Sequence, residues 1–237
     1  MFFEMLIAGA AVYGYRQFVK RPHANKAGNA SWRAPAAERA QASGLLGEKR
    51  TQAKLTEALE WCCGTDYYLH EGSIIIEHAP GTPFPTIEID HLAVTPFGVF
   101  IFETKNWSGI IEPSSNPDLL VRRTTDGKME ERKSPTAQNR TKLAFLRSVL
   151  PRGWNIQGVG VFASPECRFS ALLDTDLIGI NELPFWLRNQ RHHGSSAVID
   201  IAIAVKAIRK FEDTAPDAAI AHKRRIYQNQ TDVSRSI

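Results

Sequence analysis

The alternation of apolar and polar positions along the chain predicts a domain that mixes strands and helices. Leu92 to Val94 and Val99 to Phe102 are short runs rich in β-branched and aromatic residues, as strands are. The turn Thr95-Pro96-Phe97-Gly98 joins them, because Pro fixes one φ angle and Gly leaves another free. The pattern therefore predicts a hairpin that pairs Val94 with Val99.

Apolar positions three and four residues apart predict helices on both sides of this hairpin. A stripe of Glu48, Gln52, Leu55, Leu59 and Cys62 indicates a helix over Gly44 to Cys62 whose later half faces the core. Ser134-Pro135 is a typical helix start and Leu150-Pro151 a typical end. The remaining elements are predicted as a strand at Ser73 to His78, a hairpin around Thr125-Asp126-Gly127, a strand at Ile156 to Ala163, and helices at Leu183 to Gln190 and Ala197 to Lys210. This order predicts an α/β (α+β) fold with a central mixed β-sheet flanked by helices.

The first 21 residues differ in composition from the rest. The run from Met5 to Tyr15 carries no charge. It is shorter than the roughly 20 residues that a membrane-spanning helix needs. Arg16, Lys20 and Arg21 follow it. No basic residue precedes the run, which argues against a cleaved signal peptide. We expect residues 1–21 to anchor a cytoplasmic protein to the inner face of the membrane. The alternative is a helix that lies on the membrane surface or docks on the domain.

The segments between and after these elements complete the predicted organisation. Residues 22–43 are expected to be a linker whose later part is helical, 44–211 the main domain, and 212–237 a loose polar tail. The net charge of +4 indicates a polyanionic partner only weakly. The three cysteines, Cys62, Cys63 and Cys167, have neither zinc-site spacing nor a disulfide framework, which is typical of a reducing compartment.

Three charges interrupt the apolar hairpin. The predicted register sets Asp90 directly opposite Glu103, and Lys105 shares a face with Glu103 because it lies two residues further on. Two adjacent carboxylates repel, and a Mg²⁺ ion relieves the repulsion because it prefers oxygen ligands. With a lysine beside them, these groups provide for metal-assisted phosphodiester hydrolysis. The alternative is a surface salt bridge between Glu103 and Lys105, with Asp90 solvated.

The order Asp90, then Glu103-Thr104-Lys105, resembles the PD-(D/E)xK phosphodiesterase signature, with Ile89 at the position of the superfamily's proline. The string "EIDHLAVTPFGVFIFETKNWSGII", from Glu88 to Ile111, resembles the nuclease-related domain (NERD) family of that superfamily. Two weaker segments, "GLLGEKR" and "SPTAQNRTKLAFL", extend the likeness over the middle of the chain.

This resemblance implies a restriction-endonuclease-like core and a Mg²⁺-dependent nuclease in which Mn²⁺ substitutes. Asp90, Glu103 and Lys105 would be catalytic, and the two carboxylates would be metal ligands. Glu48 would add a metal or metal-water contact, although a first-turn glutamate also complements the helix dipole. Gln138 would orient a water or touch a phosphate, although it could also be an ordinary surface residue near a helix cap.

Basic residues gather around this predicted site. Those assigned to nucleic-acid binding are Arg122, Arg123, Lys133, Arg140 and Lys142. The alternative is that they are solvated surface charges. With the family resemblance, these residues favour a nuclease, and we expect it to act on DNA rather than RNA. Two other classes remain open: a catalytically weak module that binds nucleic acid or a partner, and a membrane-associated scaffold with the same fold.

Overall fold

The computed structural model describes residues 35–170, 173–193 and 198–235. The chain divides into the units Met1–Pro35 and Ala36–Ile237, and the fold described below is that of the second unit. The predicted membrane anchor at residues 1–21 lies outside the described residues. Within the described part of the chain, no helix is both long enough and apolar enough to cross a bilayer.

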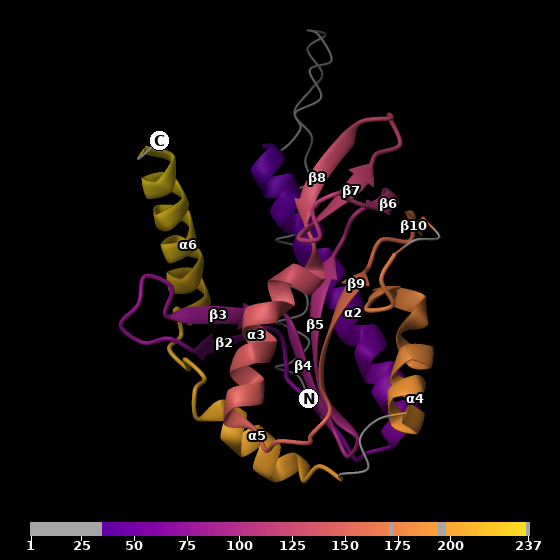
Figure 1. Ribbon diagram of the computed structural model, residues 1–237, viewed down its shortest axis with the longest axis vertical. Helices are drawn as coiled ribbons and strands as arrows, with labels where there is room; N and C mark the ends of the chain where they lie inside the picture. Colours follow the sequence, from indigo (N-terminus) through magenta and orange to yellow (C-terminus); the bar gives the residue numbers. More distant parts are fainter. Residues whose placement is uncertain (1–34, 171–172, 194–197, 236–237) are drawn as a thin grey trace, which may run out of the picture. The chain divides into compact units, whose positions relative to one another are not determined.

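A mixed five-stranded sheet forms the centre of the domain (Figure 1). β5 lies at its middle, antiparallel to β4 on one side and parallel to β9 on the other. Its strands, in spatial order, are β1 (Tyr68–Leu69), β4 (His91–Thr95), β5 (Gly98–Lys105), β9 (Ile156–Phe162) and β11 (Leu177–Gly179).

Helices cover both faces of this sheet. Successive residues of β5 point to opposite sides, so this apolar strand presents buried side chains to both faces. Phe100 and Phe102 pack in one core cluster with apolar residues of α2 (Ala36–Cys63) and α4 (Leu183–His193). Val99 and Ile101 pack in a second cluster with residues of α3 (Pro135–Val149) and α5 (Ile201–Arg209). The expected α/β fold with a central mixed sheet flanked by helices is confirmed.

Two smaller sheets and a last helix extend the domain. One sheet has the order β10 (Cys167–Phe169), β6 (Gly109–Pro113), β7 (Leu119–Arg123) and β8 (Met129–Lys133). The other pairs β2 (Ile74–Glu77) with β3 (Thr86–Ile89). A short 3₁₀ helix spans Ile180–Glu182, and α6 spans Ala218–Arg235 beside β2 and β3.

Two helix starts differ from the sequence predictions. α2 begins at Ala36 rather than Gly44, because the alanine-rich segment before Gly44 favours helix and continues the same element. α5 begins after Asp200 rather than at Ala197, because the Asp200 side chain caps the helix by accepting the N–H of Ile203.

The expectation of a loose tail after Glu212 is wrong over residues 218–235, which form α6. Ala218 and His222 are buried there, and His222 hydrogen-bonds to Thr86 of β3. Packing against β2 and β3 stabilises a helix that is otherwise rich in polar residues.

Candidate active site

The end of β5 brings Glu103 and Lys105 to the face of the sheet that α3 covers. Val99 and Ile101 point to this face, so the next odd-numbered residues point there as well. The hairpin register pairs His91 with Phe102, which leaves Asp90 and Glu103 as the next facing positions. Asp90 lies just before β4, and its Oδ2 accepts the N–H of Thr104 at 2.9 Å. The predicted register is therefore present, with Asp90 at the end of the ladder.

Glu103 is buried, and an ammonium group holds each of its carboxylate oxygens. Lys105 Nζ lies 2.6 Å from Oε1, and Lys142 Nζ lies 2.5 Å from Oε2. Glu103 is only 4% exposed and Lys142 only 7%. In the ion pair of Glu103 with Lys105 the carboxylate is buried while the lysine is partly exposed, so the pair is not a solvated surface salt bridge. Lys142 of α3 lies inside the site rather than on the exposed basic surface.

The two carboxyl groups have opposite protonation tendencies. Burial, followed by the nearby charge of Glu103, raises the pKa of Asp90 to about 7. Burial would also raise the pKa of Glu103, but the charges of Lys142 and Lys105 outweigh it and lower that pKa. In the metal-free protein, Glu103 is therefore ionised near neutral pH, while Asp90 holds its proton up to about pH 7.

Two pockets meet at these carboxylates. The α2-side pocket, of about 520 Å³, is lined by residues of α2, the end of β5, β7, β8 and α6. The α3-side pocket, of about 530 Å³, is lined by residues of β3, α3 and α6. Glu88, Asp90 and Glu103 line both pockets. The carboxylates therefore form a shared floor that two openings reach.

The structure places Glu48 and Gln138 in different pockets. Glu48 lines the α2-side pocket, where burial, followed by the charge of Glu88, raises its pKa. Gln138 lines the α3-side pocket, and its Oε1 is buried without a hydrogen-bond partner among the described residues. Such an oxygen can accept a hydrogen bond from a water molecule in the pocket.

Two residues at the site were not predicted to belong to it, Glu88 and His91. Glu88 is the third carboxylate of the shared floor. His91 is buried, with Nδ1 2.7 Å from Oε1 of Gln52 and Nε2 3.1 Å from Oγ1 of Thr104. Both residues stand in the string "EIDH" on which the family resemblance rested, and that string is the signal that could have identified them.

The hydrogen bonds of His91 define its proton arrangement. Gln52 donates its amide N–H to the carbonyl of His70, so its Oε1 accepts a proton from Nδ1 of His91. Nε2 then accepts the hydroxyl proton of Thr104. Burial lowers the pKa of His91 to about 4, so the ring is neutral at physiological pH. His91 thereby ties α2 to Thr104, whose N–H holds Asp90.

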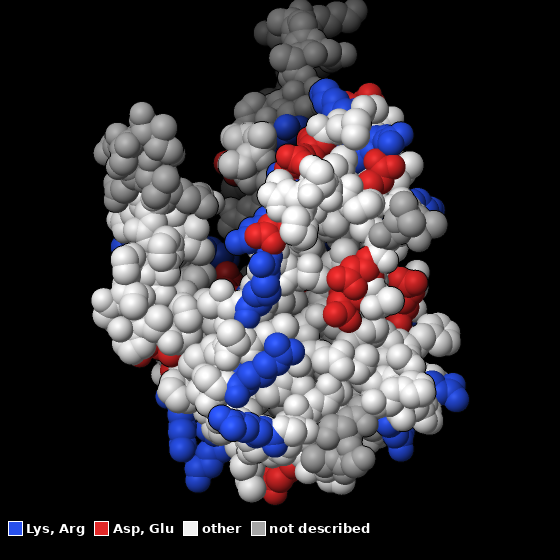
Figure 2. Space-filling view, viewed as in Figure 1, with Lys and Arg blue, Asp and Glu red and all other residues white. Residues whose placement is uncertain are grey.

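Most residues of the predicted nucleic-acid surface pair with acidic side chains. Figure 2 shows Lys and Arg mixed with Asp and Glu over the end of the domain that carries β7 and β8. Arg122 lies 3.5 Å from Glu130 and lines the α2-side pocket. Arg123 pairs with Glu112, and Arg140 pairs with Asp118. Lys133 lines the α3-side pocket.

The carboxylates suit a Mg²⁺ ion that keeps part of its water shell. Among the described residues, no three His, Cys, Asp or Glu side chains come together as an ion-binding cluster. The predicted set Asp90, Glu103 and Glu48 is therefore not a preformed triad. Mg²⁺ usually takes one or two carboxylates and several waters. Asp90 and Glu103 fit that requirement, and Glu48 fits a contact through water.

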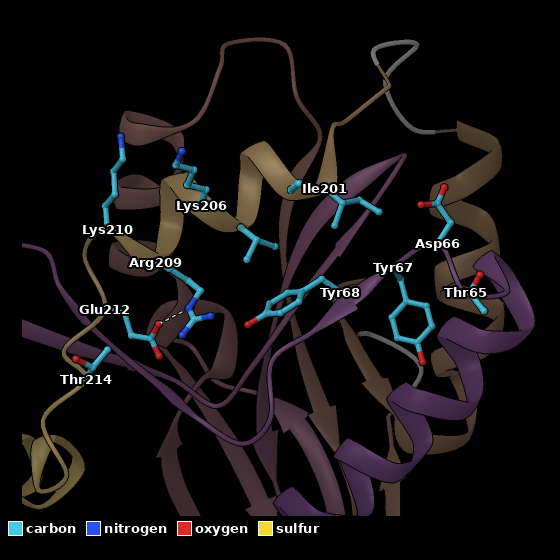
Figure 3. Close-up of a pocket in the computed structure, with 12 residues that line it drawn as sticks. Thr65, Asp66, Tyr67, Tyr68, Ile201, Lys206, Arg209, Lys210, Glu212 and Thr214 are labelled. Carbon is cyan, nitrogen blue, oxygen red and sulfur yellow. Dashed lines mark hydrogen bonds and ion pairs between the residues drawn. The ribbon is translucent and has the colours of Figure 1, made fainter.

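A larger pocket, of about 880 Å³, lies elsewhere, between α5 and the segment that leads into β1 (Figure 3). Its two carboxylates, Asp66 and Glu212, lie on opposite sides, and Glu212 is bonded to Arg209. This pocket therefore has no carboxylate pair like the one formed by Asp90 and Glu103.

A comparison against known families agrees with the fold. The family model described as "Nuclease-related domain" (NERD) matches residues 43–163, about half of the chain. The chain belongs to this PD-(D/E)xK-like family, which gives it a nuclease-related function. No curated protein and no solved structure matches the chain.

Proposed function

We propose that this protein is a metal-dependent nuclease that hydrolyses phosphodiester bonds in DNA. The observation that carries the proposal is the meeting of Asp90 and Glu103 at the shared floor of two pockets, with Lys105 beside them. Membership of the NERD family supports phosphodiester chemistry at this place.

The side chains would divide the work as follows. Asp90 and Glu103 would hold Mg²⁺, which when bound would polarise the phosphoryl group and lower the pKa of a water ligand. Lys105 would stabilise the negative charge that develops on the phosphate. Glu48 would hold a metal-bound water from the α2-side pocket, and Gln138 would orient the attacking water from the α3-side pocket.

His91 would act through Thr104 rather than on the substrate. Its neutral ring accepts the Thr104 hydroxyl proton, and the Thr104 N–H holds Asp90. His91 is therefore a positioning residue in this proposal. It keeps one metal ligand in place while its other nitrogen is bonded to α2.

We further propose that residues 1–21 tether the domain to the inner face of the membrane. The support is the uncharged run from Met5 to Tyr15 and the basic residues Arg16, Lys20 and Arg21 after it. The nuclease proposal does not depend on this tether, because none of the residues assigned to metal binding or catalysis lies in that segment.

The direct test is cleavage by purified protein that lacks its first 21 residues. Linear DNA, circular DNA, single-stranded DNA and RNA should each be incubated with Mg²⁺, Mn²⁺ or EDTA. We expect cleavage of DNA with either metal, none with EDTA, and none by Asp90→Asn. Binding of DNA without cleavage under every metal condition would instead identify a binding module. Cleavage that persists in EDTA would contradict metal dependence.

A further inference from the structure

Helix α6 lies beyond the residues that the family model matches, yet it forms part of both pockets. Lys223 lines the α2-side pocket, and His222 and Ile226 line the α3-side pocket. Since the two pockets share their floor, one helix borders the carboxylates along both openings. The C-terminal segment is thus a component of the site and not an appendage to it.

Direct hydrogen bonds fix α6 to β3 and to the loop before it. His222 Nδ1 lies 2.9 Å from Oγ1 of Thr86, and Arg225 donates to the same oxygen at 3.0 Å. Asn229 donates to the carbonyl of Pro83 at 3.0 Å. Thr86 is two residues from Glu88 on the same strand, so both lie on the same face of β3. Strand β3 therefore both holds α6 in place, through Thr86, and carries Glu88, one of the carboxylates that line both pockets.

The neighbouring basic residues of α6 have different surroundings. Arg225 is occupied by its hydrogen bond to Thr86. Lys223 is exposed, lines the α2-side pocket and has no ion-pair partner among the described residues. Arg224 is also exposed but lines neither pocket at the carboxylates. Among the α6 side chains that the structure describes, Lys223 is therefore the cation that is available to a ligand in the α2-side pocket.

Other cations border the same pocket. Arg122 of β7 and Arg132 of β8, which both pair with Glu130, line it together with Lys105, while Glu48, Glu88, Asp90 and Glu103 contribute the acidic groups. This distribution suits a phosphate backbone, which cations contact while the carboxylates hold a metal ion.

We propose that α6 forms one wall of the nucleic-acid groove and that Lys223 binds a phosphate of the strand that passes Asp90 and Glu103. This inference rests on the proposed nuclease function and adds a contact outside the family-matched region. Arg122 and Arg132 border the pocket from β7 and β8, so the strand would run between them and α6.

The test is the affinity of the protein for a fluorescein-labelled oligonucleotide, measured by anisotropy in Ca²⁺ to prevent cleavage. We expect Lys223→Ala to weaken binding about tenfold, since a charge-assisted hydrogen bond is lost. The slope of log affinity against log salt should fall by about one. Arg224→Ala, on the same helix, should stay within about twofold of the wild type. In cleavage assays, Lys223→Ala should raise KM more than it lowers kcat.

Equal affinities and salt slopes for Lys223→Ala and Arg224→Ala would overturn the role of α6 while wild-type binding and cleavage still supported the nuclease. If the wild type itself neither bound nor cleaved DNA, the proposed function would fail together with this inference. Both variants replace exposed side chains, so we expect their melting temperatures to match that of the wild type.

Discussion

Nζ of Lys142 lies 2.5 Å from Oε2 of Glu103, so an ammonium group already contacts an oxygen that we propose as a metal ligand. The second oxygen of Glu103 is held by Lys105 at 2.6 Å. A Mg²⁺ ion that binds Glu103 would therefore compete with these ammonium groups for the carboxylate oxygens and be repelled by their charge. Lys142 also lines the α3-side pocket, so this competition would take place at the pocket.

The first prediction concerns this competition. Lys142→Met removes the ammonium but keeps a side chain of similar length. In EDTA the variant should melt at a lower temperature, because a buried charge-assisted hydrogen bond of about 1.5–3 kcal/mol is lost. Mg²⁺ should then raise its melting temperature by more than it does for the wild type. The measurement is thermal unfolding with and without Mg²⁺.

Lys133→Met is the matched control, since Lys133 is an exposed lysine that lines the same pocket. It should leave both melting temperatures close to those of the wild type. A smaller Mg²⁺ response in Lys142→Met than in the wild type would mean that Lys142 supports metal binding rather than competing with it.

The second prediction is that the rise in melting temperature caused by Mg²⁺ depends on pH. The folded pKa of Asp90 is raised from 3.8 to about 7, so the folded protein binds a proton that the unfolded chain has already released. Its contribution to stability is present below the unfolded pKa and is lost as the pH rises through about 7. Mg²⁺ needs the ionised carboxylate, so its affinity should rise about tenfold per pH unit up to that point.

The Mg²⁺-induced rise in melting temperature should therefore be larger at about pH 8 than at about pH 5. Asp90→Asn should show a small rise at both values, because this side chain does not titrate. Calorimetry in two buffers of different ionisation enthalpy should detect proton release on Mg²⁺ binding below pH 7. A wild-type response that is the same at both pH values would rule out Asp90 as a ligand that must lose a proton.

The third prediction concerns Lys105, which lies beside the carboxylates and is partly exposed to the pocket. Lys105→Ala should keep the fold and respond to Mg²⁺ at least as strongly as the wild type, because it removes one of the two ammonium groups at Glu103. It should nevertheless lower kcat about 100-fold or more, because charge stabilisation matters most in the transition state. Lys105→Arg should also be slow, since a planar guanidinium does not replace a compact ammonium. Near-normal cleavage by Lys105→Ala would contradict the proposed mechanism.

The hairpin that carries the site could be predicted because its determinants are local. Alternating side chains and the Pro-Phe-Gly turn define the pairing of Val94 with Val99, and the structure has this register. The ends of α3 were equally accessible, since Ser134-Pro135 and Leu150-Pro151 mark them in sequence. Once the register is known, the side of the sheet to which Glu103 points follows.

The inward position of Lys142 could not be predicted in the same way. A lysine in a helix usually faces solvent, and only the packing of α3 against β5 shows that Glu103 stands opposite. The helix α6 was missed for a related reason. Its sequence is polar, and its stability depends on contacts with β2 and β3 that are more than a hundred residues distant.

The fourth prediction concerns residues 1–21, whose role as an anchor stays a sequence-based prediction. Full-length protein should sediment with membranes and resist extraction by carbonate or high salt, because an inserted apolar segment is released only by detergent. Protein that begins at Pro22 should remain in the supernatant and cleave DNA equally well. Release of the full-length form by salt alone would show that the segment binds the surface without inserting.

The last prediction concerns the contact that brings α2 to the site. A Cβ atom at Gly47 would lie 2.7 Å from Cβ of Asn106, the residue that follows Lys105. Asn106 also donates to the carbonyl of Ser43 at 2.8 Å, so the start of α2 is held against the end of β5. Gly47 thereby allows the close approach that places Glu48 in the α2-side pocket.

Gly47→Ala should therefore destabilise the protein. Alanine would add about 1 kcal/mol of helix propensity, but overpacking typically costs about 1–3 kcal/mol. Gly44→Ala is the control in the same helix, because a Cβ there meets nothing within 4 Å. The control should raise the urea midpoint, while Gly47→Ala should lower it and weaken the Mg²⁺ response by displacing Glu48. If both variants raised the midpoint equally, α2 would not need this contact to support the site.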